Sequence, residues 1–448
     1  MTVDLREAQR LAEAGELDQA WQITDQALKN NPDDVLALVL ATFILERSKR
    51  TTTAYQFARR VTELKPNQSA AWTNFGRCAD ELWRYEEAER AFRKAIKYAE
   101  SPRVEALNLL NLAALYINYG EFSKAEPVCR EALKKDPDSK KAKANLGFCL
   151  LARRQWADGW KMYAECLGSV QRRKMQYGDE PEWQGENGKT VVIYGEQGIG
   201  DELSFASMIP DACKRANVIV DCDPRLQNLF KRSFPQAKVY GTRGQVAEWE
   251  DQFDASCAMG SLGGLFRTKD EDFTGAPYLI ADPDRVTMWK ALWATKKKPV
   301  IGVAWSGGLW HTGAKARKMS LDDFLPLFEA IDAHFVCLQY ADSQAEIDEF
   351  LTRHPHIDLK QYQFATLTKD YDDTAALVAS LDVVVSMQTA VVHLAGALGV
   401  KTHVIVPQGQ WRYGEKYSDI PWYSSVKVWR KGNEWPVKAI VGALNADL

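Results

Sequence analysis

The sequence lacks several features that would place the protein in familiar classes. Basic and acidic residues nearly cancel, 57 against 60, so the net charge of −3 provides no positive field for sequence-independent binding to nucleic acid. No run approaches the roughly 20 apolar residues of a membrane span, and the first residues alternate charge with leucine instead of forming a secretion signal. We therefore expect no nucleic-acid partner, no membrane span and a protein that stays inside the cell.

Cysteine is present, but without the spacing of a metal or redox site. The eight cysteines stand mostly in apolar surroundings, and no two of them form a C-x-x-C pair. This usage indicates reduced, buried thiols and predicts a cytoplasmic protein. With 46% apolar residues over 448 positions, the chain can bury ordinary cores in roughly three domains of ~150 residues each.

Small residues recur about every 34 positions through the first third of the chain, with prolines between repeats. The recurring residues are Ala8, Gly76, Ala113 and Gly147; Ala20, Ala54, Ala88, Ala125 and Gly159; and Pro32, Pro66 and Pro137. Small residues where two helices touch, and proline after the second helix, match the tetratricopeptide pattern. We expect about five helix pairs over residues 1–166, stacked into a solenoid.

A solenoid of helix pairs receives a partner and carries no chemistry of its own. Neighbouring pairs stack because no pair buries its apolar stripe alone, and the concave face of the stack takes a protein or an extended peptide. We therefore predict a macromolecular partner. Mechanical support of the domains that follow is the alternative role.

From about residue 191 the pattern changes to short β-branched runs that alternate with amphipathic segments. The expected strands cover 191–194, 218–222, 238–241, 300–305, 334–339, 382–386 and 402–407. This alternation predicts parallel sheets covered on both faces, in two α/β lobes over 191–285 and 298–448. The polar segment 167–190 is interpreted as a linker, and the ligand is expected in the crevice beyond the carboxyl ends of the strands.

The loop after the first expected strand carries three glycines and Asp201 before a helix. It lacks the Gly-Lys-Ser/Thr of a P-loop, and Leu203 stands where a dinucleotide fingerprint needs its third glycine, which disfavours a nicotinamide cofactor. Asp201 is a candidate general base for an attacking hydroxyl. Capping the helix is the alternative role of this carboxylate.

The loop after the strand at 382–386 has the character of an anion site. Thr389 and Ala390 open a helix of small residues whose free amides suit a diphosphate, and His393 follows one turn later. A buried, structural His393 is the alternative.

The loop after the strand at 300–305 is flexible at its start and cationic at its end. It begins Ser306-Gly307 and ends with Lys315, Arg317 and Lys318. These cations could neutralise a leaving phosphate, and solvated surface charge is the alternative.

Two motifs suggest metal ligands at first sight. Asp221-Cys222-Asp223 ends a strand and precedes Pro224, where acidic turn residues are common, and His354-Pro355-His356 has no further ligands at useful spacing. We interpret both as ordinary turns or loops, and predict neither a metal nor a cofactor.

Several segments, taken in order, resemble bacterial tetratricopeptide proteins that end in a GT-B glycosyltransferase domain, related to lipopolysaccharide heptosyltransferases and more distantly to protein O-GlcNAc transferases. The matching segments cover nearly the whole chain and are Pro181-Glu182-Trp183, 188–206, 301–308, 335–340, 372–386, 389–399, Trp411-Arg412-Tyr413 and Pro421-Trp422-Tyr423. The resemblance implies an all-α tetratricopeptide solenoid followed by an α/β GT-B fold of two Rossmann-like lobes.

The same resemblance implies a metal-independent sugar transfer from a nucleoside diphosphate donor on the second lobe to an acceptor on the first. In this resemblance, Asp201 matches the position proposed as general base. The positions that bind diphosphate are matched by Thr389, Ala390 and the region 315–318. The positions that usually line the nucleotide are matched by Gln339 and Tyr340. The family generally has an aspartate directly before the threonine. This chain has Gln388 there, which removes a charge beside the donor.

We therefore predict a cytoplasmic, inverting glycosyltransferase that uses a nucleotide sugar and whose solenoid selects a protein or glycan acceptor. Gln388 keeps a second hypothesis open, a binding scaffold that carries a degenerate GT-B module. A nucleotide-sugar epimerase with the same two lobes is a third hypothesis, but it does not explain what the repeats are for.

Overall fold

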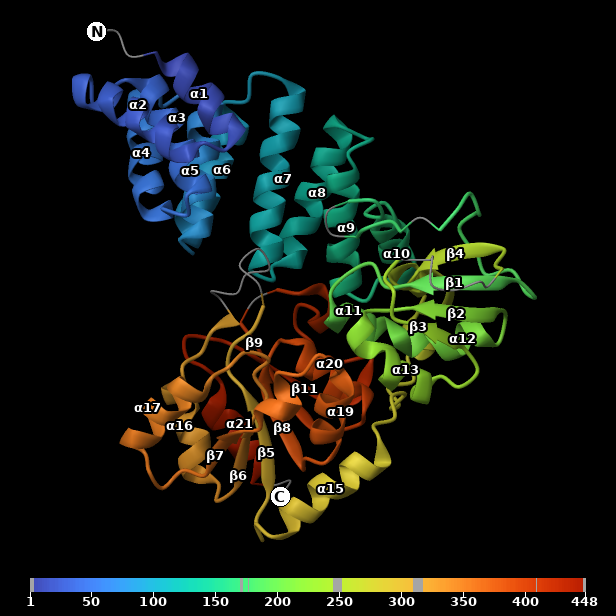
Figure 1. The fold of residues 1–448 in the computed structure, drawn as a ribbon. Helices are drawn as coiled ribbons and strands as arrows, with labels where there is room; N and C mark the ends of the chain where they lie inside the picture. Colours follow the sequence, from blue (N-terminus) through green and yellow to red (C-terminus); the bar gives the residue numbers. More distant parts are fainter. Residues whose placement is uncertain are drawn as a thin grey trace. The chain divides into compact units, whose positions relative to one another are not determined.

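The computed structural model of the chain describes residues 4–169, 172–175, 177–244, 252–308, 317–407 and 409–445. The chain forms two compact units, Met1–Cys149 and Leu150–Leu448. The border between them falls within helix α9 (Lys140–Ala152). Figure 1 colours the chain from blue at the N-terminus to red at the C-terminus.

The described part of the first unit is built from helices joined by short turns (Figure 1). The helices are α1 (Leu5–Ala14), α2 (Leu17–Asn30), α3 (Val35–Arg47), α4 (Thr51–Leu64), α5 (Ser69–Glu81), α6 (Tyr85–Lys97), α7 (Pro102–Asn118), α8 (Phe122–Lys135) and α9 (Lys140–Ala152). Each helix contacts the next one along the chain from α1 to α8, as a solenoid of helix pairs requires.

The recurring small residues lie where these helices meet. Ala20, Ala54, Ala88 and Ala125 are all completely buried. A Cβ atom added at Gly76 would lie 2.6 Å from the ring of Phe92, which is itself buried. Close helix packing therefore explains the period of small residues, and the expected all-helical solenoid is confirmed.

The second unit begins with α10 (Trp156–Ala164) and a first lobe with a parallel sheet in the order β3-β2-β1-β4. Its elements are β1 (Thr190–Tyr194), α11 (Ile199–Phe205), α12 (Ile209–Cys213), β2 (Asn217–Asp221), α13 (Gln227–Ser233), β3 (Lys238–Tyr240), β4 (Ala255–Ala258) and α14 (Gly263–Phe266), and α15 (Pro283–Ala294) leads to the second lobe. Helix α10 packs on this lobe, since the indole of Trp160 donates to the carbonyl of Arg267 over 2.7 Å.

The segment expected as a linker is packed against the first lobe in its described part. Arg172 and Trp183 are buried, and the backbone amide of Trp183 donates to the carbonyl of Ser256 at 2.9 Å. The polar composition of this segment predicts a linker. The partners that bury Arg172 and Trp183 come together only in the folded lobe.

The second lobe has a seven-stranded sheet in the order β10-β11-β9-β8-β5-β6-β7, parallel except for the β10–β11 pair. Its elements are β5 (Val300–Ala304), α16 (Leu321–Ala330), β6 (His334–Cys337), α17 (Gln344–Arg353), β7 (Leu359–Gln361), α18 (Gln363–Thr366), α19 (Tyr371–Ala379), β8 (Val383–Met387), α20 (Ala390–Ala397), β9 (Thr402–Val406), β10 (Asp419–Ile420), β11 (Tyr423–Arg430) and α21 (Val437–Leu444). The expected α/β region with parallel sheets is confirmed.

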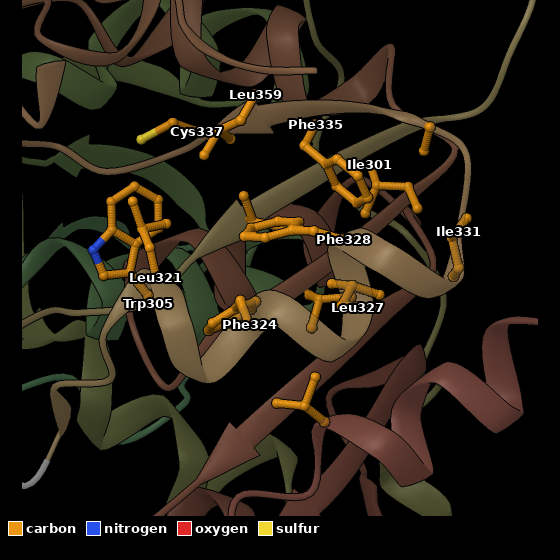
Figure 2. Close-up of a cluster of buried hydrophobic side chains, with 14 of the residues drawn as sticks. Ile301, Trp305, Leu321, Phe324, Leu327, Phe328, Ile331, Phe335, Cys337 and Leu359 are labelled. Carbon is orange, nitrogen blue, oxygen red and sulfur yellow. The ribbon is translucent and has the colours of Figure 1, made fainter. Parts of the chain in front are cut away.

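A buried apolar cluster fixes one face of this sheet. Figure 2 shows Phe328 of α16 beside Ile301 of β5 and Phe335 of β6, and Phe324 and Leu327 of the same helix belong to this cluster. Because side chains alternate along a strand, the residues of β8 that do not join this cluster point to the opposite face. Helix α20 contacts β8, β9 and β11.

The seven predicted strands all occur, within two residues of the expected bounds. The sequence did not predict β4, β7, β10 and β11. Strand β4 consists of the small residues ASCA, β7 and β10 are very short, and β11 mixes polar with apolar residues. None of these carries the continuous β-branched run that marked the other strands.

The buried cluster predicts a large difference between two phenylalanines of the second lobe. Phe328 is buried and lies 4.7 Å from Phe335 between ring centroids, so Phe328→Ala should lower the free energy of unfolding by about 3–5 kcal/mol. Phe364 is 71% exposed and stacks on Trp289, so Phe364→Ala should cost about 1 kcal/mol or less. Urea unfolding followed by near-UV circular dichroism measures both, and equal losses would contradict the assignment of this core.

Candidate functional site

The site lies where the carboxyl ends of β1, β5 and β8 lead into loops. At the start of α11, Gly200 approaches α20 so closely that an added Cβ would lie 3.4 Å from the Cα of Ala390 and 3.3 Å from the ring of His393. The first turns of α11 and α20 therefore meet. This contact brings the expected acceptor-side carboxylate, Asp201, next to the expected diphosphate helix.

Asp201 is engaged through both carboxylate oxygens. Oδ2 accepts from the backbone N–H of Gly198 at 3.1 Å, and Oδ1 is ion-paired with Nη1 of Arg412 at 2.8 Å. The carboxylate thus caps α11, which was the alternative role considered from the sequence. Its side chain remains 29% exposed, so the same group can also face a substrate.

Arg412 enters from the short 3-10 turn Trp411–Tyr413 near the end of the chain. Its guanidinium lies over the rings of Phe205 and Trp411, 4.5 Å and 4.4 Å from their centroids. The side chain is only 9% exposed, and within the described part of the chain its Nε and Nη2 atoms have no hydrogen-bond partner. Sequence reasoning gave Arg412 no role. An arginine between two aromatic residues was the available signal.

The loop after β5 folds back on itself beside α20. Ser306 and Lys318 form an antiparallel bridge, and Gly307 N–H donates to the carbonyl of Arg317 at 3.2 Å. A Cβ on Gly307 would overlap the methyl group of Thr389, so glycine is required at this approach. The loop therefore brings Ser306 and Gly307 to the N-terminus of α20.

The two described cations of this loop differ in their exposure to water. Arg317 is buried and its Nη1 lies 3.4 Å from the carbonyl oxygen of Gln388. Burial lowers the pKa of the Arg317 guanidinium, because removal from water disfavours the charged form, while Tyr413 and Tyr340 act in the opposite direction. Lys318 is exposed, as expected for solvated charge. Lys315 lies outside the described residues.

Gln339 and Tyr340 brace the same loop. The amide of Gln339 is hydrogen-bonded to both the backbone N–H and the hydroxyl of Ser306. The hydroxyl of Tyr340 donates to the carbonyl of Gly308 at 3.3 Å, and the residue is 54% exposed. Both side chains are next to the site, and their role in lining a nucleotide stays a prediction.

Gln388 stands directly before the N-cap residue of α20 and is 1% exposed. Among the described residues, neither the oxygen nor the nitrogen of its side-chain amide has a hydrogen-bond partner. Thr389, the N-cap, makes no side-chain hydrogen bond to the helix, and its hydroxyl lies 3.4 Å from that of Ser386. The first turn of α20 is thus left without its usual cap and keeps the positive end of its dipole for another acceptor.

His393 is buried, and its Nδ1 lies 3.2 Å from the hydroxyl of Tyr423. Burial lowers the pKa of His393 to about 3, and the positive charge of Arg412 acts in the same direction. The imidazole is therefore neutral near pH 7. It supplies no charge to a diphosphate, and its contact with Tyr423 fits the structural alternative.

Buried ion pairs hold the loop that precedes Asp201. Glu196 is paired with Arg172 at 3.1 Å, both side chains being almost completely buried, and Glu202 is paired with Arg243. Burial raises the pKa of Glu202 to about 7. A Cβ at Gly195 would overlap the Glu202 carboxylate, so this glycine makes room for the second pair.

The acidic turn after β2 is used within the protein. Asp221 accepts hydrogen bonds from the backbone N–H groups of Thr242, Arg243 and Gly244, and Asp223 accepts from Arg225. In the described part of the chain, no group of three or more His, Cys, Asp or Glu side chains is arranged to hold a metal ion.

The first unit has a hollow of about 340 Å³ on α1, α3 and α5. Leu36, Val39 and Phe43 of α3 line it, and Leu36 is 71% exposed. Glu13, Glu46, Arg6 and Arg77 add charged groups of both signs. This surface offers an apolar strip with polar surroundings.

Within the residues that the structure describes, no helix has the length and apolar character to cross a bilayer.

Comparison with known proteins identifies the first unit. Residues 69–102 match the sequence model of the tetratricopeptide repeat family. The first unit carries a tetratricopeptide repeat. Arrays of this class bind protein partners, which supports the expectation of a macromolecular partner.

Relatives differ in how much of the chain they match. Protein FlbA of Caulobacter vibrioides is 28% identical over 433 residues, which cover 88% of this chain and 70% of that protein. Tetratricopeptide repeat-containing protein trd-1 of Caenorhabditis elegans is 35% identical over 91 residues, or 20% of this chain and 11% of that protein. Among solved structures, a crystal structure of MamA aligns with a TM-score of 0.33 and 18% identity over 35% of this chain and 91% of that chain.

The buried state of His393 predicts a specific dependence of stability on pH. The folded pKa of about 3 lies below the unfolded value near 6.5, so the contribution of the neutral imidazole is complete above pH 6.5 and is lost as the pH falls toward 3. Between pH 7 and pH 4, the free energy of unfolding should fall more for the unmodified protein than for His393→Gln. The difference should be on the order of 3 kcal/mol, since one unit of pKa difference between the folded and unfolded states corresponds to about 1.36 kcal/mol.

Urea unfolding at a series of pH values measures this difference. Parallel curves for His393→Gln and the unmodified protein would show that His393 titrates normally.

Proposed function

We propose that the second unit is a GT-B glycosyltransferase that moves a sugar from a nucleoside diphosphate to a hydroxyl of a protein or glycan acceptor, and that the tetratricopeptide array selects this acceptor. The observation that carries the proposal is a pair of buried arginines near the uncapped start of α20: Arg317 contacts the carbonyl of Gln388, and Arg412 is ion-paired with Asp201. Free thiols at the eight cysteines support a reducing, cytoplasmic location.

In the proposed reaction, Asp201 accepts the proton of the acceptor hydroxyl while that oxygen attacks the anomeric carbon. The bond between this carbon and the diphosphate oxygen breaks, and its electron pair leaves with the diphosphate. Attack from the face opposite the leaving group inverts the configuration. The guanidiniums and the N–H groups of α20 stabilise the departing charge, so the step requires no metal ion.

A binding scaffold with a degenerate second unit is the alternative function. Its support is the engagement of both Asp201 carboxylate oxygens, by Gly198 and Arg412, together with Gln388 in place of an acidic residue. Thermal unfolding with a panel of nucleotide sugars separates the two functions. A ligand that binds only the folded state adds about 2.7 kcal/mol of stability at a hundredfold excess over its Kd. No shift with any donor would favour the scaffold.

Asp201→Asn should abolish most of the transfer while leaving donor binding nearly unchanged. The amide keeps an oxygen that can accept from Gly198 but cannot take the acceptor proton, so the rate should fall by about 10²–10⁴-fold. Asp282→Asn, which keeps an N-cap of α15, is the matched control and should retain full activity. Release of labelled sugar into acceptor measures turnover, and an unchanged rate would remove Asp201 from the mechanism.

A further inference from the structure

We propose that Arg412 connects the acceptor base to the leaving group, holding Asp201 through one nitrogen and binding the donor diphosphate through the opposite edge of its guanidinium. This inference rests on the proposed function and adds a positioning residue that also binds substrate.

The contacts of Arg412 are unequal around its guanidinium. Nη1 is ion-paired with Asp201 at 2.8 Å, whereas Nε and Nη2 have no partner among the described residues although the side chain is 9% exposed. A buried, charged donor without an acceptor is unfavourable, and such groups often mark a site completed by a ligand. The unused nitrogens therefore point to an anion that is bound during function.

The unused pair also has the geometry of an oxyanion site. Nε and Nη2 form the side-on edge of a guanidinium, whose two parallel N–H groups match two oxygens of one phosphate or carboxylate. The rings of Phe205 and Trp411, 4.5 Å and 4.4 Å away, hold the plane of the guanidinium. Its second edge is thus presented in a fixed direction.

The surroundings favour an anion at this edge. Asp201 is the single carboxylate ion-paired with Arg412 in the described structure. The hydroxyl of Tyr413, also buried and without a partner among the described residues, lies within the fields of Arg412, Arg317 and Asp201. A purely structural Arg412 that only fixes Asp201 would leave the unpartnered edge of its guanidinium unexplained.

The arrangement couples the two ends of the proposed transfer. As the new bond forms, the proton reaches Asp201 and removes its negative charge, while the electron pair of the breaking bond adds negative charge to the diphosphate. Arg412 touches the group that loses charge and faces the group that gains it. The guanidinium can therefore strengthen its hold on the leaving group without moving.

Binding of inorganic pyrophosphate and of a panel of nucleoside diphosphates to the full chain tests this inference by isothermal titration calorimetry. The unmodified protein should bind at least one of these probes. Arg412→Gln should weaken that binding at least tenfold. Asp201→Asn should bind it as tightly or more tightly, because a negative charge beside the anion is removed.

The double variant separates anion binding from a role exerted only through Asp201. If Arg412 binds the diphosphate itself, Arg412→Gln should cause the same loss in the Asp201→Asn background as alone. Arg412→Lys keeps the charge but lacks the parallel donor pair, and should show an intermediate loss if Arg412→Gln does not fold. Arg225→Gln removes a charge paired with Asp223 elsewhere in the first lobe and should leave binding unchanged.

Two outcomes would overturn the inference, and they differ in what they imply. If the unmodified protein binds a probe and folded Arg412→Gln binds it equally well, Arg412 does not contact the diphosphate while the proposed function stands. If the unmodified protein binds none of the probes, both the proposed function and the role of Arg412 are lost.

Discussion

Burial of positive charge is the constraint on which the site of the second unit depends. Arg317 and the side chain of Arg412 are almost fully removed from water, and α20 adds the positive end of its dipole next to them. Asp201 offsets part of this charge and the faces of Phe205 and Trp411 stabilise another part. Under the proposed function, the unpartnered edge of the Arg412 guanidinium remains for an anion.

Further buried ion pairs stabilise the loop that carries Asp201. Breaking one partner of a buried pair leaves an uncompensated charge, so the pairs Arg172–Glu196 and Arg243–Glu202 hold this loop in one conformation. Glycines then permit the close approaches that side chains would block, at Gly200 against α20 and at Gly307 against Thr389. Fixed charges and absent side chains together place the groups of both lobes in one site.

The two units differ in how their side chains pack. In the array, small residues such as Ala54 and Ala88 let helices pack closely, and a hollow with exposed Leu36 remains for a partner. In the α/β unit, continuous apolar strands form the core, and the candidate site residues lie in loops at one edge of the sheets. Under the proposed function, the first unit supplies acceptor specificity and the second supplies donor binding and transfer.

The sequence alone determined the features that depend on local pattern. The interval of small residues specified the helix pairs, and the β-branched runs specified seven strands. That the loops after β1, β5 and β8 carry a functional site stays a prediction. Strands β4 and β7 were not predicted, because the small residues of β4 and the short length of β7 give no periodic hydrophobic pattern. The segment around Arg172 and Trp183 was interpreted as a linker because its polar composition does not reveal the partners that bury it.

Only the tertiary structure decided how the candidate residues act on one another. The ion pair of Asp201 with Arg412, the neutral state of His393 and the unpartnered amide of Gln388 all arise from contacts, or their absence, between segments far apart in the chain. Local sequence fixes which backbone conformations form and where loops begin. Charge state and orientation depend on burial and on neighbours, which exist only after the lobes have folded and met.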